Sequence, residues 1–212
     1  MTYARFDHQT ITDLIPQGST VLDLGCGDGD LLSLLIREKN AHAVGIDNNP
    51  FFVATGVIRN KTILQGDVET CLAAYKDKGY DYVVLNKSLT EVVDIDLVLH
   101  EALRIGKKVI VGFENLAHYK SRLELFFLGK TPTAITATAN RHYFSIHDFK
   151  NYCQRQSIEI FKAVYLTENT QTPFFFANLF AVQAIYVISK DHPSVLEKLI
   201  SAKYRYADGG GI

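Results

Sequence analysis

Residues 21–30, "VLDLGCGDGD", combine a glycine-rich turn with several carboxylates. Glycine-rich turns that follow an apolar strand usually hold phosphates, but the dinucleotide pattern G-x-G-x-x-G has Asp30 in place of its third glycine here. A P-loop would need Gly-Lys-Ser/Thr, which is absent from this turn. Asp23 and Asp28 would also repel a diphosphate. The stretch therefore predicts a ligand that is a cation, or a zwitterion, with hydroxyl groups.

Further polar residues end the strand-like stretches that follow the turn. Asp47 lies about 20 residues after the glycines, where an acidic residue accepts hydrogen bonds from ribose hydroxyls. Asp67 ends the next stretch, where a carboxylate can accept from an adenine amino group. Both aspartates also suit the N-cap of a helix. Asn86 and Lys87 end the stretch after that, and such residues touch either the cofactor or its acceptor.

Backbone N–H groups of a glycine turn can hold a small carboxylate. Adenine, ribose, an amino acid and a net positive charge together describe S-adenosylmethionine, with S-adenosylhomocysteine as its demethylated product. The residues predicted to contact this cofactor are Asp23, Gly25, Cys26, Gly27, Asp28, Gly29, Asp47, Asn48, Asp67, Val68, Asn86 and Lys87.

These side chains need strands whose carboxyl ends meet at one edge. From residue 20 onward, apolar strand-like runs alternate with helix-like segments, which predicts a parallel sheet covered on both faces. Two later runs, at 158–167 and 179–189, are joined by a loop without a helix and must pair as an antiparallel hairpin. The predicted fold is α/β, with a seven-stranded, mostly parallel sheet and a C-terminal antiparallel hairpin.

Residues 1–212 are predicted to form a single domain. A helix is expected at 4–15, with Phe6, Ile11, Leu14 and Ile15 on its apolar face, and an additional helix at 193–207. Residues 131–140, "TPTAITATAN", are uncharged and show no periodicity, so they are expected to form a loop.

The composition favours a cytoplasmic protein. The net charge is −1, which gives no electrostatic reason to expect nucleic acid or an anionic membrane. The three cysteines have no C-x-x-C spacing, and no basic-then-apolar leader precedes the first helix. The longest apolar run is shorter than the ~20 residues of a membrane span. The histidines show no metal-ligand spacing, so no metal site is predicted.

The motifs "LDLGCGDG", "GID" and "QGD" resemble those of class I S-adenosylmethionine-dependent methyltransferases, which implies a three-layer, Rossmann-like fold. Over residues 16–190, "YDYVVLNKSLTEV", "ALRIGKKVIVGFENLAHY" and "NRHYFSIHDFKNYC" resemble the methionine-biosynthesis MetW family. The chain departs from that family at Glu114, where a proline is usual, and it lacks tryptophan. The family implies a link to methionine supply and a homoserine O-acyltransferase as partner.

Two functions fit these residues. The first is a methyltransferase, for which Glu114 or His118 would be the base toward an oxygen acceptor. The second is a regulatory subunit that senses S-adenosylmethionine and tunes the acyltransferase without methylating anything. Residues 173–180, "PFFFANLF", have too many consecutive aromatics for one core. The predicted C-terminal helix, a second copy of the chain or the acyltransferase could cover them, and we expect a protein partner.

Overall fold

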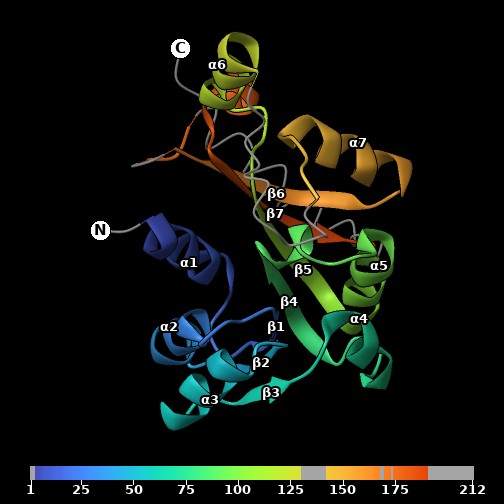
Figure 1. Ribbon diagram of the computed structural model, residues 1–212. Helices are drawn as coiled ribbons and strands as arrows, with labels where there is room; N and C mark the ends of the chain where they lie inside the picture. Colours follow the sequence, from blue (N-terminus) through green and yellow to red (C-terminus); the bar gives the residue numbers. More distant parts are fainter. Residues whose placement is uncertain (1–2, 130–141, 168–169, 173, 191–212) are drawn as a thin grey trace.

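The computed structural model describes residues 3–129, 142–167, 170–172 and 174–190. One seven-stranded sheet lies between two layers of helices (Figure 1). Its strands are β1 Thr20–Leu24, β2 His42–Asp47, β3 Ile63–Gln65, β4 Tyr80–Asn86, β5 Gly106–Glu114, β6 Glu159–Leu166 and β7 Gln183–Ser189. The helices are α1 Tyr3–Leu14, α2 Asp30–Lys39, α3 Pro50–Ile58, α4 Val68–Cys71, α5 Ile95–Ile105, α6 Tyr119–Leu128, α7 Ile146–Arg155 and α8 Ala177–Phe180, with 3-10 turns η1 Leu72–Ala74, η2 Ser88–Thr90 and η3 Phe174–Phe176.

The strand order is β3-β2-β1-β4-β5-β7-β6. All neighbouring strands are parallel except at β7, which runs antiparallel to both β5 and β6. The order reverses between β1 and β4, and this switch point is where ligands bind in open α/β sheets. The predicted fold class, including the C-terminal antiparallel pair, is confirmed.

Alternate residues of the strands face two separate apolar layers. On one face, Val84 and Ile110 pack with Ile11 and Ile15 of α1 and with the leucines of α2. On the other face, the strands pack against α5 and α7. Figure 1 shows the same division, with α1, α2 and α3 covering one side and α4, α5 and α7 the other. The sheet is therefore buried on both faces, so a ligand can reach it only at the ends of its strands or along its edge strands.

Local sequence signals explain the helix boundaries. The side chain of Asp94 accepts from the backbone N–H of Leu97 at 2.9 Å and caps α5. Ser145 and Asp148 form a reciprocal capping box at the start of α7, as their spacing predicts. The N-terminal helix is confirmed within one residue of its expected bounds. Among the described residues, no helix is long and apolar enough to cross a membrane.

Two expectations near the C-terminal pair are wrong in detail. The predicted strand 179–189 begins only at Gln183, and the connection before it contains η3 and α8 rather than a helix-free loop. Asn115 explains the change, because its side-chain amide donates to the carbonyl of Ala181 at 2.8 Å and holds the helical turn against β5. The predicted loop 131–140 and helix 193–207 lie outside the described residues.

Candidate functional site

The glycine turn between β1 and α2 has a backbone that other residues would not tolerate. Gly25, Gly27 and Gly29 all have positive φ, at 77°, 57° and 76°. A Cβ on Gly25 would lie 2.4 Å from that of Ser88, so the turn packs closely against the end of β4. A Cβ on Gly27 would meet nothing within 4 Å. Gly25 thus fixes the turn against the sheet, while Gly27 borders open space in which a ligand can lie.

Asp47 connects the end of β2 to this turn. Its Oδ2 accepts from the N–H of Gly27 at 2.7 Å, and its Oδ1 accepts from the N–H of Asn49 at 2.9 Å. Asp47 is buried, yet each carboxylate oxygen keeps a second lone pair for a ligand hydroxyl. The N-cap of α3 is Asn49, not Asp47. Asp47 therefore bonds to the glycine turn and to Asn49 and is not the N-cap of α3.

Asp23 is a buried carboxyl group beside the turn, on β1. It is 2% exposed, and no described residue donates a hydrogen bond to its carboxyl group. Burial, and secondarily repulsion from Asp47, raise the pKa of Asp23 from 3.8 to about 7. A buried carboxyl group without a donor is costly, so this position favours a cationic ligand group.

The other two carboxylates of the turn are already neutralised. Asp28 pairs with the guanidinium of Arg59 at 2.8 Å, and Asp30 lies 3.5 Å from the ammonium of Lys61. Both cations come from the connection between α3 and β3. The expected repulsion of a diphosphate by Asp28 is therefore weaker than the sequence suggests, and the negative charge that faces the turn belongs to Asp23 and Asp47.

The turn offers fewer free donors than expected. The N–H groups of Gly25 and Cys26 donate to the carbonyl of Ile46, and that of Gly29 donates to Cys26. The N-terminus of α2 has no side-chain cap, because its N-cap residue is Gly29. The first N–H groups of α2 are thus the donors best suited to a ligand carboxylate.

Cys26 is held inside the turn. A Cβ on Gly45 would lie 2.4 Å from its sulfur, so the absence of a side chain at Gly45 provides the space for the thiol. Burial, together with Asp23 and Asp47, raises the pKa of Cys26. The thiol therefore stays protonated and serves packing rather than nucleophilic chemistry.

Asp67, the residue predicted to contact adenine, lies just after β3. Asp67 is exposed and caps α4, its Oδ1 accepting from the N–H of Glu69 at 2.8 Å. Val68 is half-buried next to it, and Asn48 is exposed after β2. The capping role of Asp67 is confirmed, and one of its carboxylate oxygens takes no part in that cap.

The end of β4 lies between the glycine turn and α1. The hydroxyl of Ser88 is buried without a described hydrogen-bond partner, and its side chain is the one that contacts Gly25. Asn86 donates to Asp7 of α1 at 3.0 Å, and Lys87 lies 3.7 Å from the same carboxylate. Asn86 and Lys87 therefore reach the α1 side of the edge, while the residue that touches the glycine turn is Ser88, which the sequence did not single out.

The two candidate bases have different surroundings. Glu114 ends β5 with its side chain 75% exposed and lies 4.0 Å from the ammonium of Lys87. His118 is buried and caps α6, its Nδ1 accepting from the N–H of Lys120 at 3.3 Å. Glu114 therefore lies beside Lys87 at the carboxyl ends of the strands, whereas Nδ1 of His118 is used to cap α6.

Two residues at this edge were missed by the sequence analysis. Asp7 occupies the helical stripe that continues through Ile11 and Ile15, and it is buried while the predicted Phe6 is about one-third exposed. Gln183 is buried at the start of β7. A polar residue on an apolar stripe was the available signal for Asp7, whereas the place of Gln183 depends on the strand order.

A family model described as "Methionine biosynthesis protein MetW" matches residues 5–188, which is most of the chain. The chain belongs to the MetW family. A curated relative, the bifunctional methionine biosynthesis protein MetXA/MetW of Rhodopirellula baltica, is 29% identical over 175 residues. That match covers 75% of this chain but only 28% of the relative, so the chain spans less than a third of the length of that relative.

Solved structures give the same fold. A S-adenosylmethionine-dependent methyltransferase from Thermotoga maritima superposes with a TM-score of 0.65 at 18% identity, covering 89% of this chain and 90% of that one. The geranyl diphosphate C-methyltransferase of Streptomyces coelicolor, solved with S-adenosylhomocysteine, has a TM-score of 0.61 at 14% identity and coverages of 89% and 81%. At these identities the likeness shows the fold, which is the class I methyltransferase fold.

Proposed function

We propose that this MetW-family chain binds S-adenosylmethionine at the glycine turn and transfers its methyl group to a small acceptor. The observation that carries the proposal is the pair of buried carboxylates, Asp23 and Asp47, on either side of a turn that borders open space at Gly27. An adenine nucleotide with a diphosphate would bring two negative charges to this pair, whereas S-adenosylmethionine brings an ammonium and a sulfonium.

Each group of the cofactor has a suitable partner in the chain. The ammonium matches Asp23, and the amino-acid carboxylate matches the uncapped N-terminus of α2 and the orphan hydroxyl of Ser88. The ribose diol matches the free lone pairs of Asp47, and adenine matches Asp67 and Val68. When bound, the cofactor supplies an electrophilic methyl group, and the protein contributes mainly by positioning the acceptor against it.

The proposal is tested by methyl transfer itself. The protein is incubated with S-adenosylmethionine and candidate acceptors, and S-adenosylhomocysteine is quantified by mass spectrometry. Turnover that is lost in Asp47→Ala supports the enzyme. Tight cofactor binding without turnover on any acceptor would instead favour a regulatory subunit.

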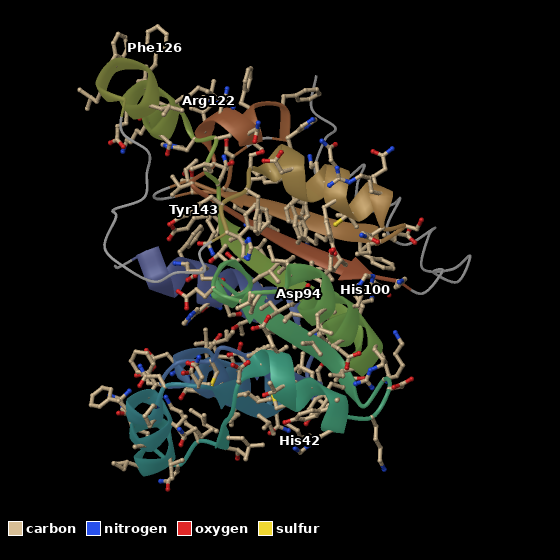
Figure 2. The ribbon with its side chains drawn as sticks, turned by 45° about the vertical axis from the view of Figure 1, so that its right-hand side comes forward. His42, Asp94, His100, Arg122, Phe126 and Tyr143 are labelled. Carbon is tan, nitrogen blue, oxygen red and sulfur yellow. The ribbon has the colours of Figure 1, made fainter. Side chains whose placement is uncertain are left out.

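The second candidate function, a non-catalytic subunit of a homoserine O-acyltransferase, is favoured by an exposed apolar surface. Four residues of α6 lie along one helical stripe and are all exposed, and η3 and α8 continue the surface. The apolar surface consists of Tyr119, Leu123, Phe126, Phe127, Phe176 and Phe180. Figure 2 shows Phe126, which is 81% exposed, at the outer end of α6 and pointing away from the sheet.

One curated relative is a bifunctional MetXA/MetW protein. We therefore propose a MetXA-type acyltransferase as the partner that binds the apolar surface. The same surface contains Phe176 and Phe180 of the 173–180 segment that the sequence assigns to partner binding. Co-purification with a MetXA-type acyltransferase, and acyltransferase rates measured with and without S-adenosylmethionine, test this function. The apolar surface could instead bind a second copy of the chain. Sedimentation of the isolated chain tests this, and dimers that persist at low concentration would support it.

A further inference from the structure

A polar cluster lies beside the glycine turn on the α1 face of the sheet. It is centred on Asp7, which is 1% exposed and whose Oδ2 accepts from the side-chain amides of Asn86 at 3.0 Å and Gln183 at 3.4 Å. Lys87 lies 3.7 Å from the same oxygen and 4.0 Å from Glu114. These five residues are called the Asp7 cluster below.

The strand register places the members of the Asp7 cluster on one face. Glu114 and Gln183 are directly opposite each other in the antiparallel β5–β7 pair, so their side chains project to the same side. A Cβ on Gly112 would lie 2.4 Å from Oδ1 of Asn86, so the amide occupies space that any other residue would fill. The ends of β4, β5 and β7, together with α1, therefore hold the members of the cluster in place.

One buried acceptor of the Asp7 cluster, Oε1 of Gln183, has no donor among the described residues. The Nε2 of Gln183 donates to Asp7 and to Oδ1 of Asn86, which are both acceptors and which therefore fix the orientation of the carboxamide. Its Oε1 then faces away from them, buried, with no described hydrogen-bond partner. Buried amide oxygens normally have a donor, so a ligand N–H or O–H is expected here.

The charges of the cluster select the kind of donor. Asp7 and Glu114 are carboxylates, and Lys87 is the ammonium that lies between them, so these three residues have a formal charge of −1. A ligand anion would have to displace one of the two carboxylates from Lys87. A ligand ammonium instead adds the missing positive charge and offers N–H groups to Gln183 Oε1 and to the largely exposed Glu114.

The backbone of Lys87 is strained where it places the side chain in the Asp7 cluster. Lys87 has φ 67°, in the left-handed region that side chains rarely adopt, and its N–H donates to the carbonyl of Gly112 at 2.7 Å. This geometry directs Lys87 to the Asp7 cluster while Ser88, the next residue, contacts Gly25 of the glycine turn. Strained backbone of this kind concentrates at functional sites.

We propose that the Asp7 cluster binds the amino group of a small primary amine, held as its ammonium ion by Gln183 Oε1 and Glu114. Its role as the acceptor side of methyl transfer rests on the proposed function, because that role requires the cofactor at the glycine turn. The binding of an amine to the cluster does not require the cofactor.

The test uses matched probes that differ only in the charged group. The protein is titrated calorimetrically with n-butylamine hydrochloride and with sodium butyrate, each with and without saturating S-adenosylhomocysteine. The amine should bind at least about tenfold more tightly than the carboxylate, since it gains charge-assisted hydrogen bonds that the anion lacks. Equal affinities, or tighter binding of butyrate, would overturn the proposal.

Three variants locate the binding. Glu114→Gln changes an exposed side chain and should weaken amine binding about fivefold or more. Gln183→Leu should do the same, with a thermal melt to show that it folds. Glu124→Gln, an exposed glutamate on α6, is the control and should leave the affinity unchanged. Amine binding that survives both Glu114→Gln and Gln183→Leu refutes the site, whereas a failure of S-adenosylhomocysteine to bind refutes only the proposed function.

Discussion

Replacement of Asp23 by asparagine should stabilise the free protein at neutral and alkaline pH. The pKa of Asp23 is raised from 3.8 to about 7, mainly by burial, so the ionised form is disfavoured in the folded state. At ~1.4 kcal/mol for each pH unit, ionisation of this group costs about 4 kcal/mol of folding free energy above pH 7. Asparagine removes the charge but leaves a buried amide, which costs about 1–3 kcal/mol.

The sign of the pH dependence follows from the raised pKa. The stabilising contribution of protonated Asp23 is complete below pH 3.8 and is lost progressively as the pH rises to about 7. The free energy of unfolding of Asp23→Asn minus that of the parent should therefore increase by about 2 kcal/mol between about pH 5.5 and pH 8. Urea denaturation of parent and variant at the two pH values measures this shift directly.

Asp13→Asn is the matched control, because Asp13 is exposed on α1 and should show no such shift. The reasoning about Asp23 is refuted if the free-energy difference between parent and Asp23→Asn is the same at both pH values. It is also refuted if the variant is the less stable protein at alkaline pH by more than the cost of an unsatisfied amide.

Four further outcomes are expected. Asp47→Ala should weaken S-adenosylmethionine binding at least about tenfold in calorimetry, because bonds to a charged acceptor are lost, while the protein stays folded. Gly27→Ala should weaken it too, and should lower the thermal midpoint because alanine is strained at φ 57°. NAD should bind at least about a hundredfold more weakly than S-adenosylmethionine, since Asp23 and Asp47 repel its diphosphate, and competition titration checks this. The double variant Phe126→Ser, Phe176→Ser should lose acyltransferase capture in a pull-down and keep cofactor affinity, whereas unaltered capture would remove the apolar surface from consideration.

Much of the fold was predictable because the signals are local. The alternation of apolar strands with amphipathic helices, and the capping box of Ser145 and Asp148, depend on residues a few positions apart. The glycine turn and Asp47 were predictable for a related reason, since parallel strands bring their carboxyl ends to one edge. In the structure the two are joined directly, because the N–H of Gly27 donates to Asp47, a bond that the sequence did not predict.

The remaining features depend on contacts between distant segments. Asp28 looks like a bare charge in the sequence, but Arg59, thirty-one positions away, neutralises it. The helical turn of α8 is held by Asn115, the residue after β5, and no local pattern in "NLFAV" indicates that contact. Asp7 and Gln183 meet although 176 positions separate them, because β7 inserts between β5 and β6.

The central claim, that the glycine turn is a S-adenosylmethionine site, is tested most directly by calorimetric titration of the protein with S-adenosylmethionine across the pKa of Asp23. If the ligand ammonium binds ionised Asp23, the association constant should rise about tenfold for each pH unit up to about pH 7 and then level off, and Asp23→Asn should abolish that rise. The absence of any binding heat or thermal shift with S-adenosylmethionine and S-adenosylhomocysteine would contradict the claim.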